Sequence, residues 1–269
     1  MNLRCQFLKI TVFIYKKVSI QAMDIKKYLD STYLKTAKQA GITKSENILV
    51  AQSFIQEAIN EDFKLIMIRP IMVSLAKEMI TEANSKVLIG TVIDFPKGKS
   101  DLENKLAEAQ KAIEDGADDL DFVCNYKAFK KGDIDLVKNE ILACTTLGLE
   151  HHKTVKWIIE VAALNAKQII QLSALIKNLV ISNFKEEHYA SVFVKSSTGF
   201  YKTKNNLPNG ATRETIILML ENASPLPVKA AGGVRTLEEA IAMIRLGVKR
   251  IGTSSAKSIA NNALSQSDY

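Results

Sequence analysis

The sequence predicts a single-domain (β/α)8 TIM barrel, and three observations lead to this α/β fold class. Short apolar segments alternate with amphipathic helical segments along most of the chain. Eight such units fit into a chain of 269 residues, of which 47% are hydrophobic. Several predicted strands carry alternating polar residues, which suit a barrel interior better than an open sheet covered by helices on both faces. A doubly wound open sheet is the main alternative.

Seven apolar runs are expected to be strands, and helical segments such as 102–117, with apolar residues at helical spacing, lie between them. The short segment YLDST, at 28–32, is the candidate for the remaining strand of the barrel. The seven runs lie at 64–68, 86–93, 118–124, 155–162, 191–197, 227–233 and 250–255.

Local signals predict where two of the helices begin and where one ends. Ser100 with Glu103, and Thr236 with Glu239, match the capping box, in which side chains bind the free N–H groups of the first turn. Gly247 stands where the helix after Thr236 should end, because glycine adopts a left-handed backbone without a steric penalty.

Three regions are expected along the chain. Residues 1–22 differ in character from the rest and are interpreted as an N-terminal extension, either disordered or the product of a start upstream of Met23. Their apolar patch is short for a signal peptide, and no small-residue cleavage site follows it. The barrel is expected over 23–260 and a mobile C-terminal tail over 261–269.

Composition and charge narrow the classes of function. The net charge is +7, but the lysines are scattered, which argues against a nucleic-acid surface and favours a small anionic substrate. No apolar run reaches the roughly 18 residues that a membrane span needs, so no membrane contact is expected. The three cysteines, Cys5, Cys124 and Cys144, match no zinc or redox spacing and indicate a reduced, cytoplasmic protein.

The carboxyl ends of the predicted strands carry the candidate site, because in a barrel these ends face one common region. No metal site is expected, since the histidines (151, 152 and 188) fall in a loop or before a strand and lack metal-ligand spacing. The residues expected to converge are Asp30, Thr32, Asp121, Glu160, Lys195, Lys229, Ser254 and Ser255.

Two lysines that follow apolar strand residues, Lys195 in SVFVKSSTGF and Lys229 in PVKAAGGVRT, suggest covalent chemistry. Only a neutral amine attacks a carbonyl, and an ordinary lysine has a pKa of about 10.4. Burial and a neighbouring ammonium both lower that pKa, and roughly three units correspond to about 4 kcal/mol. The pair is therefore interpreted as a Schiff-base nucleophile and the lysine that tunes it, with Asp121 transferring protons. The alternative is a structural network of both lysines with Asp121 and Glu160.

The last two strand ends have the composition of a phosphate site. Glycines and hydroxyls occur at both ends, in AAGGVRT and RIGTSS. Backbone N–H groups at such turns, with hydroxyls and a helix N-terminus, bind phosphate, and barrels often bind it after strands 7 and 8. The residues concerned are Gly232, Gly233, Gly252, Ser254 and Ser255.

From about Asp24 to its last helix, the chain resembles the 2-deoxyribose-5-phosphate aldolase family, class I aldolases with a (β/α)8 barrel. The motifs KYLDSTYL, TVIDFPKG, GADDLDFVCNY, VKWIIE, FVKSSTGF, VKAAGGVRT and RIGTSS occur in the family's order and at close to its spacing. The resemblance implies a lyase of deoxyribose phosphate catabolism that reversibly cleaves 2-deoxy-D-ribose 5-phosphate to D-glyceraldehyde 3-phosphate and acetaldehyde. It implies no cofactor, because the protonated imine is the electron sink. A homodimer and a homotetramer both stay open.

The resemblance also implies roles for single residues. Lys195 matches the family's Schiff-base lysine, Lys229 the lysine that lowers its pKa, and Asp121 the proton-shuttling aspartate. Asp30 and Thr32 match positions that line the site and hold the substrate hydroxyl and the catalytic water. The family's phosphate-binding turns match Gly199, Gly232, Gly233, Gly252, Ser254 and Ser255.

Several positions are variable in the family or depart from its pattern. Tyr269 matches a terminal tyrosine that assists proton transfer in some members. Met67 stands where some members carry a site cysteine, which predicts less inactivation by acetaldehyde. Val161 replaces a common threonine, and the loop 201–210 is longer and more basic than usual. Its lysines, 202 and 204, either reach the phosphate or are simply solvated.

Two rival functions are considered. One is another Schiff-base barrel enzyme, such as a transaldolase or a fructose-bisphosphate-type aldolase, which would accept ketose phosphates instead of deoxyribose 5-phosphate. The other is a barrel that binds phosphate without catalysis, which the presence of Lys195, Lys229 and Asp121 argues against.

Overall fold

The computed structural model describes residues 24–205 and 207–261. The expectations for residues 1–22, for the C-terminal tail after residue 261 and for Tyr269 therefore lie outside the described part. Eight parallel strands form one closed barrel in chain order, with β1 paired to β8. The predicted (β/α)8 fold is confirmed and the open-sheet alternative is wrong. The strands are β1 (Leu29–Tyr33), β2 (Leu65–Ile68), β3 (Leu88–Ile93), β4 (Asp119–Val123), β5 (Thr154–Ile158), β6 (Val192–Lys195), β7 (Val228–Ala231) and β8 (Arg250–Thr253).

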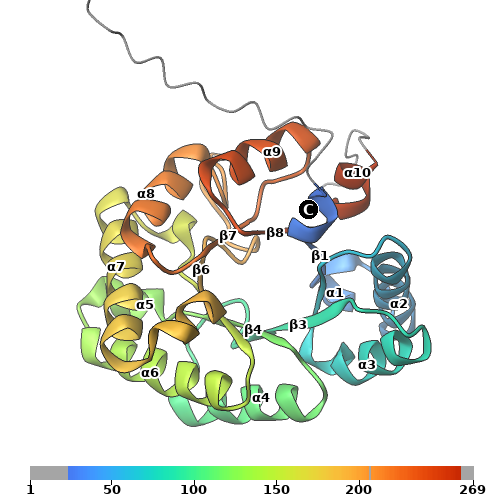
Figure 1. Cartoon of the computed structure of the whole chain (residues 1–269), viewed down its shortest axis with the longest axis horizontal. Coiled ribbons are helices and arrows are strands. Elements are labelled where there is room, and N and C mark those ends of the chain that lie inside the picture. The colour runs from blue at the N-terminus through green and yellow to red at the C-terminus, as the bar shows by residue number, and fades with distance from the viewer. Residues whose placement is uncertain (1–23, 206, 262–269) are drawn as a thin grey trace, which may run out of the picture.

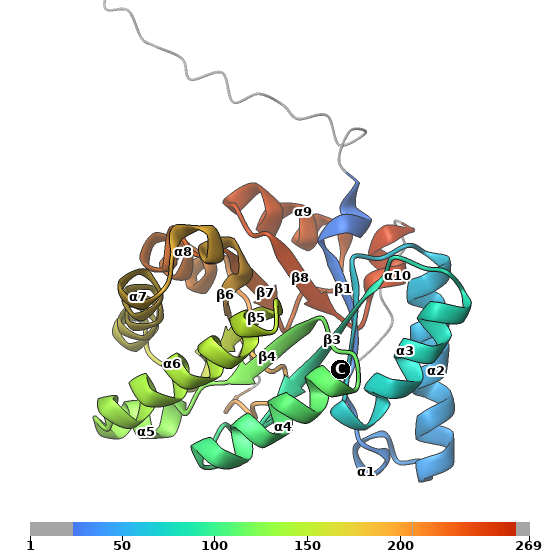
Figure 2. The ribbon, with the colours of Figure 1, turned by 60° about the horizontal axis from the view of Figure 1, so that its bottom comes forward.

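The helices surround the strands as an outer ring, as Figures 1 and 2 show from two directions. None of the helices in the described ranges is long and apolar enough to cross a membrane. The α-helices are α1 (Ala37–Ala40), α2 (Lys44–Asn60), α3 (Val73–Glu82), α4 (Leu102–Glu114), α5 (Tyr126–Lys131), α6 (Ile134–Glu150), α7 (Ala166–Asn183), α8 (Arg213–Ala223), α9 (Leu237–Leu246) and α10 (Ala256–Ala260). Short 3-10 helices are η2 (Ile25–Tyr28), η3 (Pro70–Met72), η4 (Val161–Ala163) and η5 (Glu186–Ser191).

The predicted helix signals are confirmed at α9 and corrected at α4. Thr236 and Glu239 form the capping box of α9, and Gly247 ends this helix with a φ of 118°. The expected box at Ser100 is wrong, because Asp101 is the N-cap of α4 and its side chain accepts the N–H of Asn104. Ser100 instead donates its N–H and hydroxyl to the carboxylate of Asp94, at 2.8 and 2.9 Å.

The strand expected over 155–162 is shorter than predicted. β5 ends at Ile158, because Glu160 adopts a left-handed backbone with a φ of 57° and the 3-10 helix η4 begins at the next residue. A left-handed turn takes the chain out of the extended conformation that strand pairing needs. Glu160 therefore lies just beyond the strand rather than in it.

The apolar core lies between the barrel wall and the helices. Trp157 of β5 stacks on Phe122 of β4, with ring centroids 5.2 Å apart, and both side chains are fully buried. The indole N–H of Trp157 donates to Oγ1 of Thr145 in α6 at 3.0 Å. Buried indoles need such a partner, so this hydrogen bond connects the barrel wall to its helical cover.

We expect the Thr145→Val variant to lower the free energy of unfolding by about 1–3 kcal/mol, because valine keeps the shape but leaves the buried indole N–H without its acceptor. Chemical unfolding followed by Trp157 fluorescence measures the change. Thr146→Val, at the exposed neighbouring position of α6, is the matched control and should change stability by less than about 0.5 kcal/mol. Equal losses in the two variants would contradict a stabilising role for this hydrogen bond.

Candidate active site

Two lysines share one carboxylate oxygen inside the barrel. Lys195 is the last residue of β6, and Lys229 is its register partner on β7. Their Nζ atoms lie 2.8 and 2.9 Å from Oδ2 of Asp121, which reaches them from β4. Side chains from three strands thus converge as the sequence predicted, because alternate strand residues point into the barrel.

Asp121 is surrounded by positive charge. In addition to the two lysines, Lys156 of β5 donates to its Oδ1 at 2.8 Å and to Asp119 at 2.6 Å. Burial would raise the pKa of Asp121, but the ammonium groups of Lys156, Lys195 and Lys229 hold the pKa well below its usual range. Asp121 is therefore ionised and keeps accepting hydrogen bonds from both lysines.

Asp30 lies beneath the lysines and does not line the pocket described below. Its Oδ2 is 2.6 Å from Nζ of Lys229, and its Oδ1 accepts from Nε of Arg250 at 2.7 Å. Burial would raise the pKa of Asp30, and the charges of Arg250, Lys229 and Lys156 lower it overall. In this geometry Asp30 anchors Lys229, while Thr32, two residues later on β1, lines the pocket.

Lys195 has the electrostatics of a nucleophile. Burial lowers the pKa of its ammonium most strongly, Asp121 opposes this, and the charge of Lys229 adds to it, so that the pKa is about 8. At pH 7 about one tenth of Lys195 is then neutral, against fewer than about one in a thousand at a pKa of 10.5.

The balance of charges in the barrel interior also supports Lys195 as the group that loses a proton. Four cationic side chains meet three carboxylates in this buried cluster, so that one ammonium proton is in excess. Loss of one proton neutralises the cluster, and buried charge is costly unless it is paired. The group with the lowered pKa is Lys195. The cations are Lys156, Lys195, Lys229 and Arg250, and the carboxylates are Asp30, Asp119 and Asp121.

The predicted structural network is only partly realised. Both lysines pair with Asp121, as that alternative required. Glu160, its second expected carboxylate, instead forms hydrogen bonds with the hydroxyls of Ser197 and Thr198 in the turn after β6. Lys195 thus depends on one carboxylate that it shares, which leaves its ammonium easier to deprotonate than that of a lysine with a carboxylate of its own.

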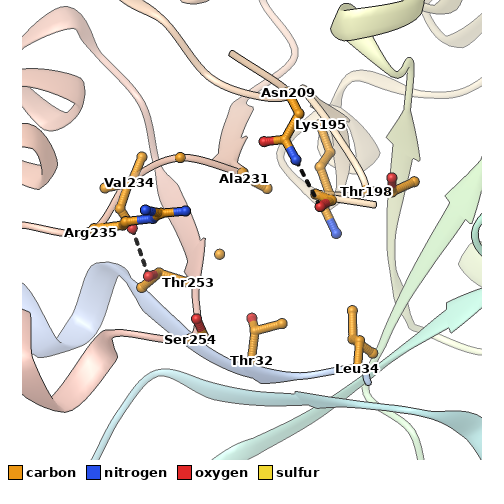
Figure 3. A pocket seen from close by; sticks show the side chains of 14 residues that line it. Thr32, Leu34, Lys195, Thr198, Asn209, Ala231, Val234, Arg235, Thr253 and Ser254 are labelled. Carbon is orange, nitrogen blue, oxygen red and sulfur yellow. Dashed lines mark hydrogen bonds between the residues drawn. The ribbon is translucent and has the colours of Figure 1, made fainter. Parts of the chain in front are cut away.

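A pocket opens above Lys195 at the carboxyl ends of β6, β7, β8 and β1. In Figure 3, Lys195, Thr198 and Asn209 lie on one side, and Arg235 and Ser254 on the other. Ser255, expected at the site, is instead the buried N-cap residue of α10 and does not line the pocket. The lining residues are Thr32, Leu34, Lys195, Thr198, Gly199, Asn209, Ala231, Gly232, Gly233, Val234, Arg235, Gly252, Thr253 and Ser254.

Close contacts and backbone angles explain why glycine occupies three positions in or next to the pocket. A Cβ at Gly252 would lie 3.1 Å from Cε of Lys229, so this glycine leaves room for the lysine stem. A Cβ at Gly210 would lie 2.3 Å from the carbonyl oxygen of Gly232, where the loop 201–210 returns to the turn after β7. Gly232 itself has a φ of 79°, which favours glycine.

Sequence reasoning missed four polar residues of the pocket, and one of them, Thr253, is the last residue of β8. Arg235 follows Gly232, Gly233 and Val234 in the turn after β7, and its guanidinium reaches the pocket from there. Thr198 and Asn209 come from the turn after β6 and from the end of the next loop. The lysines of that loop, Lys202 and Lys204, are exposed and outside the pocket lining.

The remaining sequence expectations concern residues away from the lysines. Met67 is fully buried in the barrel, in a cluster with Leu34, Leu65 and Val92. Val161 is buried in η4. In the described part of the chain, no group of three or more His, Cys, Asp or Glu side chains is arranged to hold a metal ion.

A closed (β/α)8 barrel that presents a buried lysine of lowered pKa beneath a glycine-lined pocket has the features of a Schiff-base enzyme. The model of the DeoC/LacD family aldolases matches residues 18–259. The chain therefore belongs to this family.

Relatives with the name deoxyribose-phosphate aldolase agree with this membership. The chain is 40% identical to the deoxyribose-phosphate aldolase of Thermococcus gammatolerans over 90% of its own length and 97% of the relative's. It is 37% identical to that of Lactococcus lactis, over 92% and 100%. Its structure is similar to that of the tetrameric deoxyribose phosphate aldolase of Aeropyrum pernix, with a TM-score of 0.69, 26% identity and coverage of 88% and 90%.

We expect Lys229→Met to raise the pKa of Lys195 above about 8, because the substitution removes a neighbouring positive charge and leaves more of Asp121 to Lys195. The measurement is the pH dependence of reductive methylation at Lys195, read by peptide mass mapping. Reactivity requires the neutral amine, so its midpoint should move to higher pH. Lys86→Met, at an exposed lysine before β3, is the control. An unchanged midpoint in a folded Lys229→Met protein would contradict the tuning role.

Proposed function

We propose that this chain is a class I aldolase that reversibly cleaves 2-deoxy-D-ribose 5-phosphate to D-glyceraldehyde 3-phosphate and acetaldehyde. The observation that carries the proposal is the sharing of one Asp121 oxygen by Lys195 and Lys229, with Lys195 at the floor of the pocket. The substrate follows from the relatives that are named deoxyribose-phosphate aldolases. A small phosphorylated sugar also suits a basic chain.

In the cleavage direction, neutral Lys195 attacks C1 of the open-chain aldehyde and forms a carbinolamine. Asp121, 2.8 Å from Nζ, is positioned to transfer protons, directly or through a water, as the carbinolamine loses water to give the protonated imine. Deprotonation of the C3 hydroxyl then breaks the C2–C3 bond. Its electron pair moves into the imine, which becomes an enamine, and D-glyceraldehyde 3-phosphate departs.

The cycle ends when C2 of the enamine takes up a proton and water hydrolyses the resulting imine to acetaldehyde and free Lys195. The imine nitrogen stores the electron pair in between, so the scheme uses no cofactor. The ammonium group of Lys229, which pairs with Asp30 and Asp121, disfavours protonation of free Lys195. Thr32 lines the pocket at β1 and is available to hold a substrate hydroxyl or the catalytic water.

The phosphate is proposed to bind at the end of the pocket formed by the turns after β6, β7 and β8. Arg235 supplies positive charge there, and α9 begins directly after Thr236, so that its N-terminal end favours an anion. The groups proposed to contact phosphate are those of Gly199, Gly232, Gly233, Arg235, Gly252 and Ser254.

Location and assembly are also proposals. A cytoplasmic protein is supported by Cys124 and Cys144, which are both free thiols in the described ranges. Of the two assemblies considered, a homodimer and a homotetramer, the tetrameric relative from Aeropyrum pernix supports the homotetramer, and the mass in solution distinguishes the two.

Borohydride reduction in the presence of deoxyribose 5-phosphate, followed by peptide mass mapping, tests the Schiff base directly. We expect one adduct, on Lys195, because its amine lines the pocket and has the lowered pKa. Lys195→Ala should lose the adduct and the activity. An adduct on Lys229 would reverse the two roles. A folded wild-type protein without an adduct would refute the proposed reaction.

Arg235→Met should lower kcat/KM for deoxyribose 5-phosphate by roughly 10- to 100-fold, because a hydrogen bond to a charged group contributes about 1.5–3 kcal/mol. Unphosphorylated 2-deoxyribose should be cleaved at nearly the wild-type rate. Arg245→Met, at an exposed arginine within helix α9, which begins just after Arg235, is the control. Equal losses with both sugars would place the phosphate away from Arg235.

A further inference from the structure

Glu160 is a buried acid that the reaction scheme does not use. It is 1% exposed and has left-handed backbone angles, with φ 57° and ψ 67°, an unfavourable conformation for a residue with a Cβ. The residues on either side are tied to the end of β6. The N–H of Ile159 donates to the carbonyl of Lys195 at 3.0 Å, and that of Val161 to the carbonyl of Ser196 at 2.9 Å. The strained backbone thus directs Glu160 at the turn that follows Lys195.

The carboxyl group of Glu160 holds this turn at several points. Its Oε1 is 2.6 Å from Oγ of Ser197 and 3.4 Å from the N–H of Thr198. Its Oε2 accepts the hydroxyl of Thr198. The same two hydroxyls accept the N–H groups of Gly199 and Phe200, at 3.2 and 3.0 Å. Glu160 therefore determines where the peptide groups around Gly199 lie.

If Glu160 were ionised, the short contacts of the Ser197 hydroxyl would lack one hydrogen-bonding proton. Oγ of Ser197 is 2.6 Å from Oε1 of Glu160 and also 2.6 Å from the carbonyl oxygen of Asn209. A hydroxyl has one proton and can donate to only one of these oxygens. The carbonyl of Asn209 has no proton to give. A proton on Glu160 completes the set, since Ser197 then accepts from Glu160 and Gly199 and donates to Asn209.

We propose that Glu160 acts as a neutral carboxylic acid and is a positioning residue for the phosphate end of the substrate. Its O–H donates to Ser197, whose hydroxyl connects the turn after β6 to Asn209 at the end of the loop 201–210. Asn209 in turn donates its side-chain amide to the carbonyl of Gly199 at 3.0 Å. Glu160 thus joins both segments that form one side of the pocket. The inference rests on the proposed function, because it assumes a phosphate bound at Gly199.

The surroundings of Glu160 agree with the neutral form. Burial raises the pKa of Glu160, and this outweighs the hydrogen bonds of Ser197 and Thr198 and the charge of Lys195, which lower it. Tyr126 of α5 is a further titratable group near Glu160, and burial raises the pKa of its hydroxyl. A neutral acid also avoids repulsion, because an ionised Glu160 would bring negative charge next to a bound phosphate.

The test compares Glu160→Gln with Glu160→Ala, using 2-deoxyribose 5-phosphate and unphosphorylated 2-deoxyribose. A glutamine amide donates to Ser197 and accepts from Thr198, so Glu160→Gln should keep kcat/KM for the phosphorylated sugar within about fivefold of the wild type. Glu160→Ala should lower it by more than about tenfold and affect the unphosphorylated sugar less. Glu78→Gln and Glu78→Ala, at an exposed glutamate of α3, are the matched controls.

A Glu160→Gln loss as large as that of Glu160→Ala, or equal losses with both sugars, would overturn the proposal. Infrared spectroscopy gives a readout that does not depend on activity or on the folding of Glu160→Ala. The wild type at neutral pH should have a carbonyl band of a protonated carboxyl group that Glu160→Gln lacks. Identical spectra would also overturn the proposal. A wild type that does not cleave deoxyribose 5-phosphate would refute the proposed function, whereas the infrared comparison would still decide the protonation state of Glu160.

Discussion

The structure depends on one buried carboxylate, that of Asp121, which three lysines contact. Removing one partner of a buried ion pair typically costs about 3–5 kcal/mol, because the other charge is left uncompensated. The strands that carry Asp121, Lys156, Lys195 and Lys229 are therefore coupled through their charges as well as through their backbone hydrogen bonds. The same coupling leaves Lys195 with only a share of a carboxylate, which allows its pKa to fall to about 8.

The barrel makes this arrangement possible because the outer and inner faces of its strands carry different kinds of side chain. Outward-facing residues such as Phe122 and Trp157 form the apolar contact with the helices. Inward-facing residues of the same strands carry charge, and water has little access to them. The hydrophobic layer stabilises the fold and holds the charged residues close together, where each one shifts the pKa of its neighbours.

Much of the barrel fold and of its charged interior could be predicted from the sequence. Alternation of apolar runs and helical segments predicts the barrel, and the parity of Asp121 within its strand predicts that it faces inward. The two lysines are predicted by their unusual place after apolar residues. The role predicted for Ser255 at the phosphate stays a prediction, because the chain turns into α10 at this residue and buries its side chain. The N-cap of α4 is Asp101 rather than Ser100, because Ser100 binds Asp94, six residues earlier, and the capping pattern does not include that residue.

Sequence by itself determined the fold class and predicted which charged side chains lie at the strand ends, because both follow from periodicity and residue chemistry. Tertiary structure decided which charges pair. The sequence places Asp30 and Asp121 at strand ends that face a common site, but the closed barrel determines that Lys229 contacts both of them. It also separated Glu160 from the lysines. The left-handed backbone at Glu160 turns its carboxyl group to Ser197 and Thr198, and the sequence pattern contains no signal for that turn.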